Sequence, residues 1–312
     1  MAYPVATEKT SLSVAVLAAD ATAPSPSERA AAWGDSPQRL QAEASLWRWN
    51  AAMAALHGAQ AIVVLGAALS VERLRAFKIP MTTGFTDWSR GYPMPALQHR
   101  ADMPFVAVTS GFAFLSALAH IVVLARFEQY VRDLRRGRNV FRWSEYALSS
   151  SLMIGLIAQL FGVYDVLLLV AMMSVNACMN LFGLLHEVLN EGREPARVDW
   201  SPFWFGCFAG AVPWAVVFTY LAGNAGVTGI PGFVWALLVV YAVFFNTFPL
   251  NMYLQYAQWH WWGDAYHGWP GAGYLFGERM YQVQSLVSKS FLLWLVVGGS
   301  NQPSSFTGTK AG

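Results

Sequence analysis

One lysine in the middle of an apolar run constrains what this chain can fold into. Residues 285–297 read Ser-Leu-Val-Ser-Lys-Ser-Phe-Leu-Leu-Trp-Leu-Val-Val, with Lys289 close to the centre. A charged ammonium at the middle of a bilayer costs about 2.5–3.5 kcal/mol on insertion scales. Such a group is retained only where it is neutralised, paired or used in chemistry. Every other lysine and arginine can be placed in a loop, in a tail or at a helix end.

Composition assigns the chain to the polytopic membrane proteins. It is 55% hydrophobic and 12% charged, whereas soluble domains carry about 25% charged residues. The net charge of +2 and the dispersed basic residues do not indicate a nucleic-acid partner. Both cysteines, Cys178 and Cys207, fall in apolar spans, so we expect neither a disulfide framework nor a metal site.

The hydropathy pattern predicts an all-α membrane protein with seven transmembrane helices. Each candidate span is close to the ~20 residues that a bilayer core requires. The spans are about 47–72, 103–128, 143–165, 166–189, 201–222, 230–258 and 275–299. Together they form one domain, 45–300, between a flexible N-terminal tail (1–44) and a C-terminal tail (301–312). The long first loop, 73–102, is expected to contain a short β-hairpin with one strand near Thr82–Trp88.

The distribution of positive charge predicts the orientation. Most lysines and arginines fall on the side of the N-terminus, with a cluster in residues 132–142. The positive-inside rule therefore predicts a multi-pass protein of the cell membrane with a cytoplasmic N-terminus and an extracellular C-terminus. The first loop would then be extracellular.

Polar residues around Lys289 suggest two different uses for it. Gln282, Ser285 and Lys289 share one helix face, which should point into the bundle. A desolvated lysine loses its proton more easily, and its neutral amine can condense with an aldehyde to a Schiff base. The alternative is a structural lysine paired with a carboxylate.

Glu145 is the best candidate for the anion. It lies one turn into the third span, with Ser149 and Met153 on the same face. The third and seventh spans run in the same direction, so Glu145 and Lys289 can meet at one depth. The alternative is an acid placed at a helix N-terminus by the helix dipole.

Two histidines lie inside spans. His57, with Gln60, and His120, with Ser116, suggest a network that can hold a proton near neutral pH. A lone membrane histidine is equally often a simple interhelical hydrogen bond. The pair His186-Glu187 is predicted to be interfacial and structural.

Four motifs resemble the heliorhodopsins. They are Phe141-Arg-Trp-Ser-Glu-Tyr-Ala-Leu-Ser-Ser-Ser-Leu-Met153, Asn180-Leu-Phe-Gly183, the stretch from Asn246 to Tyr256, and Leu286-Val-Ser-Lys-Ser290. The resemblance covers about residues 45–300 and includes the inverted topology and the long first outer loop.

The resemblance implies all-trans retinal bound to Lys289, with Glu145 as the sole counterion. It also implies a homodimer in the lipid membrane and a polar network of His57, His120, Ser149 and Ser288. By the same resemblance, the retinal pocket comprises Tyr146, Met153, Asn176, Trp214 and Phe245, with Ser288 beside them.

Three functions remain open. Proton-pumping rhodopsins carry a second carboxylate where this chain has Leu156 and an aspartate where it has Ser285, so a pump is disfavoured. We expect a non-enzymatic photoreceptor with a slow photocycle and an unknown cytoplasmic signalling partner. One alternative is a light-gated or light-driven ion transporter whose route is lined by Glu145, Ser149 and Ser150 together with His57 and His120. The other is a non-photochemical protein with a structural Lys289–Glu145 salt bridge.

Overall fold

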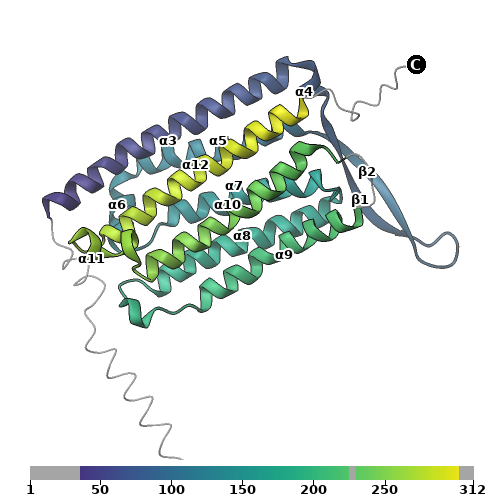
Figure 1. The fold of residues 1–312 in the computed structure, drawn as a ribbon. Coiled ribbons are helices and arrows are strands. Elements are labelled where there is room, and N and C mark those ends of the chain that lie inside the picture. Colours follow the sequence, from purple (N-terminus) through teal and green to yellow (C-terminus); the bar gives the residue numbers. More distant parts are fainter. Residues whose placement is uncertain (1–35, 225–229, 302–312) are drawn as a thin grey trace, which may run out of the picture.

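The computed structural model describes residues 36–224 and 230–301, and within them seven long helices form one bundle (Figure 1). They are α3 (Pro37–Ser70), α5 (Phe105–Ala125), α7 (Val140–Leu160), α8 (Val166–Leu189), α9 (Ser201–Asn224), α10 (Gly232–Tyr256) and α12 (Ala272–Ser300). Short elements connect them: α4 (Glu72–Ala76), α6 (Phe127–Arg135), α11 (Asp264–His267) and two turns of 3-10 helix, Pro195–Arg197 and His260–Trp262. The predicted seven-helix bundle is therefore confirmed.

The helix α3 starts earlier than the sequence predicts. Residues 37–44 were assigned to a flexible tail, but they are helical in the structure. The Ser36 hydroxyl accepts a hydrogen bond from the Arg39 N–H, and Pro37 occupies the first turn, where its missing N–H has no cost. The remainder of both predicted tails, 1–35 and 302–312, lies outside the described residues.

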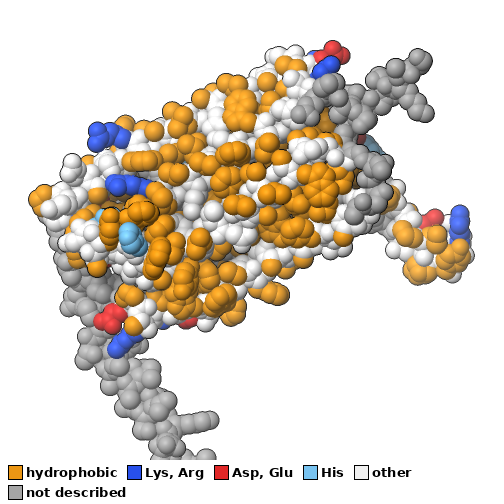
Figure 2. All heavy atoms as spheres, viewed as in Figure 1, with side chains coloured by type: hydrophobic (Ala, Val, Ile, Leu, Met, Phe, Trp, Pro, Cys, Tyr) orange, Lys and Arg blue, Asp and Glu red, His pale blue; other side chains and the backbone are white. Residues whose placement is uncertain are grey.

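Consecutive helices pack side by side around the bundle. Contacts run from α3 through α5, α7 and α8 to α9, while α10 packs on α12, which closes back on α3 and α5. On the face shown in Figure 2, apolar side chains cover most of the length of the bundle, and the charged groups lie mainly toward its two ends. This is the surface expected of a protein that spans a bilayer.

The helix α7 differs from its neighbours in composition. Among the described residues, six helices are long and apolar enough to cross a membrane, and α7 is not one of them. It carries Arg142, Glu145 and Gln159, and it packs between α5 and α8. These three side chains are covered by protein rather than lipid, so α7 needs less apolar character than a peripheral span.

The predicted hairpin is present and longer than expected. Strands β1 (Lys78–Asp87) and β2 (Met94–Pro104) pair antiparallel, with an irregularity between Met81 and Thr82. The hairpin projects from the end of the bundle that holds α4 (Figure 1). The Asp165 carboxylate, which caps α8, accepts the Gly84 N–H at 2.8 Å, and the Thr82 N–H donates to the Tyr164 carbonyl at 2.8 Å. These bonds join β1 to the α7–α8 turn.

Candidate functional site

Lys289 and Glu145 meet in the interior of the bundle. The Nζ atom of Lys289 on α12 lies 2.8 Å from Oε1 of Glu145 on α7. Nζ also donates to the Ser285 hydroxyl at 2.7 Å, and the Ser116 hydroxyl on α5 donates to the same Glu145 oxygen at 2.6 Å. Lys289 is only 3% exposed. A buried ion pair is tolerated when further hydrogen bonds satisfy both charges, as they do here.

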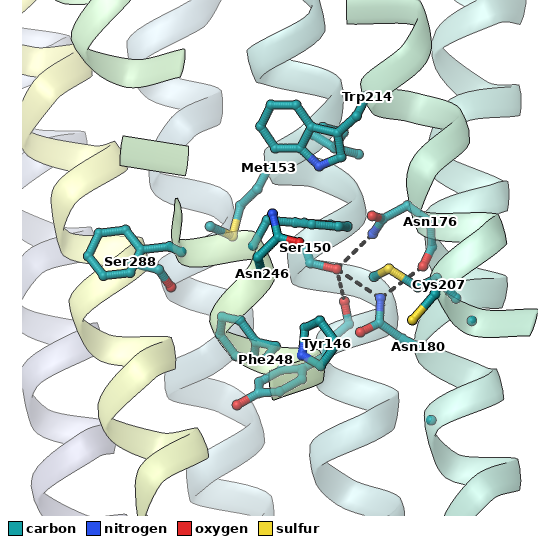
Figure 3. Close-up of a pocket in the computed structure, with 18 of the residues that line it drawn as sticks. Tyr146, Ser150, Met153, Asn176, Asn180, Cys207, Trp214, Asn246, Phe248 and Ser288 are labelled. Atoms are coloured by element: carbon teal, nitrogen blue, oxygen red, sulfur yellow. Dashed lines mark hydrogen bonds between the residues drawn. The ribbon is translucent and has the colours of Figure 1, made fainter. Parts of the chain in front are cut away.

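A large cavity adjoins one side of this pair. It has a volume of about 410 Å³ and is lined by both Ser288 and Lys289. All the residues predicted for the pocket line it: Tyr146, Met153, Asn176, Trp214 and Phe245. Figure 3 shows Met153, Trp214 and Phe248 around its apolar part. The cavity size falls in the range of small-molecule sites, ~300–1,000 Å³.

Flat aromatic groups form much of the cavity wall. The rings of Trp214 and Phe245 pack edge to face with centroids 5.5 Å apart, and Tyr146 packs on Phe248 at 5.4 Å. Gly210 lies where an added Cβ would collide with Met179 and Phe245, so a larger residue would displace the wall. Phe248, Tyr241 and Gly210 line the cavity but were not predicted, because a single sequence does not show which face of α9 or α10 turns inward.

One polar group of residues interrupts the apolar wall. The Asn176 and Asn180 amides both donate to the Ser150 hydroxyl, at 2.7 and 3.0 Å, and that hydroxyl donates to the Tyr146 carbonyl (Figure 3). Sequence analysis placed Asn176 in the pocket but gave no such role to Asn180. The available signal for Asn180 was its spacing: it lies four residues, about one helical turn, after Asn176 on α8 and therefore on the same face. Its side chain also donates to the Asn176 carbonyl.

A small polar cavity lies beside Glu145, the acidic partner of the ion pair. It measures about 30 Å³ and is lined by Glu145, Ser285, Gln282 and Glu278, among others. His120 also lines it and contacts the Asn50 side chain at 2.8 Å through Nδ1. The ion pair therefore lies between the two cavities: Lys289 lines the larger one, Glu145 lines the polar one, and Tyr146 lines both.

The two span histidines lie together beside this polar cavity. The rings of His57 and His120 stack with centroids 5.8 Å apart. The Nε2 atom of His57 is buried and, within the described part of the chain, has no hydrogen-bond partner. Ser149 is also fully buried one turn after Glu145 on α7. The structure thus brings the predicted network residues close to the ion pair, while their roles stay predictions.

A second ion cluster was missed by sequence analysis. Arg142 on α7 pairs with both Glu187 on α8 and Glu278 on α12. Glu187 was expected at the interface, but it is fully buried and accepts further bonds from Trp143 Nε1 at 2.7 Å and the Asn139 N–H at 2.8 Å. Each of these residues lies near a helix end in the sequence, a position that normally indicates exposure. Only the packing of three helices places them inside.

Comparison with known proteins gives a family. The family model described as Heliorhodopsin matches residues 46–300, which is most of the chain. No curated protein shows significant similarity to it. The matched region begins inside α3 and ends with α12, so it includes both cavities and both ion clusters.

Proposed function

Since this chain belongs to the heliorhodopsin family, which implies a retinal chromophore, we propose that it is a light-sensing receptor with all-trans retinal joined to Lys289. One observation carries this proposal: the only amine on the cavity wall, within the described residues, lies at the junction between a long apolar cavity and a buried carboxylate. The cavity fits the group, because retinal is a slender apolar aldehyde and the wall is aromatic and apolar around a terminal amine.

The chain's own residues would hold and tune this group. Bound retinal supplies visible absorption and a double bond that isomerises in light. Glu145 would balance the positive charge on the Lys289 nitrogen as counterion, and Ser116 would hold the carboxylate in place. Trp214, Phe245 and Met153 would confine the polyene and exclude water, which strengthens the interaction between the two charges.

The polar cavity would receive the proton that the Lys289 nitrogen loses in light. His57 and His120 stack beside the ion pair, and His120 bonds to Asn50. A proton held by one of the groups that line this cavity would keep the nitrogen neutral and so prolong the altered state. Such a state would relay a change in helix packing to a cytoplasmic signalling partner.

Ion transport is the less well supported alternative. Leu156, which stands where pumps carry a proton-donating carboxylate, is 2% exposed within the apolar core of the bundle. Ser285, at the second position, bonds directly to Lys289 Nζ. Neither residue can return a proton to the nitrogen as a carboxylic acid would.

Orientation and assembly are part of the same proposal. The basic residues of α6 and of the loop after it, including Arg132, Arg135 and Arg138, lie at the end of the bundle opposite the hairpin. The positive-inside rule favours placing this end in the cytoplasm, and the N-terminus with it. The family resemblance further favours a homodimer in the cell membrane, for which cross-linking in native membranes is the direct test.

The first test is a visible spectrum of the purified protein supplied with all-trans retinal. We expect a visible band that disappears in Lys289→Ala, shifts in Glu145→Gln and is unchanged in the control Lys78→Ala, an exposed lysine of β1. Light-induced current under several ion gradients should be absent. A colourless parent protein would overturn the proposal, and a steady light-driven current would replace it with transport.

A further inference from the structure

The second ion cluster carries an unbalanced charge. It contains one guanidinium, Arg142, and two carboxylates, Glu187 and Glu278, so its formal charge is −1 when both acids are ionised. Arg142 is 7% exposed and the two glutamates are 0% exposed. An uncompensated charge in such a site is costly, and taking up one proton removes it.

The two glutamates differ in how many donors surround them. A carboxylate offers about four acceptor positions. Glu187 fills them with Arg142, the Asn139 N–H, Trp143 Nε1 and, at 3.3 Å, the Tyr274 hydroxyl. Among the described residues, the donors to Glu278 are only Arg142 and the Asn139 side-chain amide, which donates to its Oε2 at 2.8 Å. Positions for a proton therefore remain on Glu278.

Glu278 also lies on the route to Lys289. Glu278, Gln282, Ser285 and Lys289 are spaced four, three and four residues apart, so they follow one face of α12 over about 16 Å. The first three line the same small polar cavity as Glu145. Its volume of about 30 Å³ has room for about two water molecules. On this face Glu278 accepts from Asn139, Gln282 Nε2 donates to the Tyr130 hydroxyl at 3.3 Å, and Ser285 accepts from Lys289.

We propose that Glu278 is the carboxylate that takes up the proton released by the Lys289 nitrogen in light. The inference rests on the proposed function and adds the identity of the acceptor. The N–H bond breaks and its electron pair stays on nitrogen, which goes from +1 to neutral. An O–H bond forms on Glu278, so the Arg142–Glu187–Glu278 cluster goes from −1 to neutral while Glu145 stays ionised.

Other titratable groups face this cluster and the cavity, and they compete for the proton. They are Glu145 and Tyr146 on α7, His120 on α5, Tyr130 on α6, Glu187 on α8, Tyr256 on α10, and Tyr274, Arg279 and Tyr281 on α12. Glu187 is saturated with donors and Glu145 is paired with Lys289, so Glu278 and His120 are the two acceptors to distinguish.

Light-minus-dark infrared spectra of the retinal-bound protein distinguish them. We expect a carboxylic-acid carbonyl band to rise as the nitrogen deprotonates and to shift in D₂O. The band should be lost in Glu278→Gln and kept in Glu187→Gln and His120→Gln. A coloured parent that forms no such band, or a band that survives in Glu278→Gln, would overturn the assignment and leave the photoreceptor function intact.

The charge imbalance has a test that needs no retinal. In the apoprotein, Glu278→Gln removes the excess negative charge, so its Tm should equal or exceed that of the parent. In Glu187→Gln, the four donors that surround the carboxylate meet an amide, which has only one acceptor oxygen. The Tm of this variant should therefore fall by several degrees, or the protein should not fold. Equal destabilisation by both substitutions would overturn the inference. If the parent protein stays colourless with retinal, both the light-dependent step and the proposed function are overturned. The comparison of apoprotein Tm values between Glu278→Gln and Glu187→Gln is unaffected by that result.

Discussion

Two buried ion clusters connect the same helices, α7 and α12, yet they differ in charge balance. Lys289 and Glu145 form a neutral pair supported by two serine hydroxyls. Arg142 faces two carboxylates, one of which belongs to α8. A neutral pair can be separated only at the full cost of two buried charges, whereas the second cluster can change its charge by gaining one proton.

The two ion clusters also differ in where they lie in the bundle. The neutral pair lies between the two cavities, with Lys289 on the wall of the one that would hold the chromophore and Glu145 on the wall of the other. The charged cluster lies nearer the end of the bundle that carries α6, where the Asn139 side chain caps α7 and also binds Glu278. A charge change there would act on three helix ends at once. Under the proposed function, light would act at the neutral pair, and the charged cluster would convert the released proton into a change at these helix ends.

Removing Arg142 should have the largest effect on stability. Arg142→Met leaves Glu187 and Glu278 buried together without a cation, and we expect a loss of about 5 kcal/mol in unfolding free energy. Unfolding of the apoprotein in detergent measures it. The double variant Arg142→Met/Glu278→Gln should recover part of this loss, because only one buried carboxylate remains. Unchanged stability in the single variant would show that the cluster is solvated in the membrane.

Removing Lys289 should have a smaller effect. Lys289→Met leaves one carboxylate, Glu145, which keeps its bond from Ser116, so we expect a loss of about 3 kcal/mol in the apoprotein. Adding Glu145→Gln should restore most of it, since the pair is then replaced by uncharged groups. If the double variant is no more stable than the single one, the two charges do not interact in the folded protein.

The smallest effect should come from Asp165, outside the membrane. The N–H groups of Leu168 and Gly84 donate to its carboxylate and lower its pKa below the ordinary value of 3.8. Because the folded pKa is depressed, its stabilisation is present above about pH 4 and is lost as the pH falls through that lowered value. Asp165→Ala should cost about 1 kcal/mol at neutral pH as a lost helix cap.

Measuring Tm as the pH is lowered distinguishes the contribution of the Asp165 carboxylate from that of other acidic residues. The Tm difference between the parent and Asp165→Ala should shrink as the pH falls below the pKa of Asp165. The control is Asp87→Ala: hydrogen bonds from Ser89 also lower the pKa of Asp87, but that residue is the last of β1 and its carboxylate caps no helix. A pH-independent difference for Asp165→Ala would show that the cap acts without its charge.

Sequence reasoning was most successful where one residue is improbable in its surroundings. Lys289 stood out because an apolar run does not tolerate an unpaired ammonium. Glu145 followed because few other acids lie inside a span, and the structure places its carboxylate 2.8 Å from the Lys289 amine. The residues predicted for the pocket all line one cavity, and their contact with retinal stays a prediction. The start of α3 was missed because a polar helix end resembles a tail.

The sequence by itself determined the number of membrane spans, the buried amine of Lys289, and an acid, Glu145, at the same depth in the bundle. These depend on composition and on spacing along one helix, which are local properties. What only the tertiary structure decided was the burial of Arg142, Glu187 and Glu278 and the join between β1 and the α7–α8 turn. Both arise where segments distant in the chain pack together. Whether a polar residue near a helix end faces water or protein depends on its neighbours in space, and spacing along one helix does not encode them.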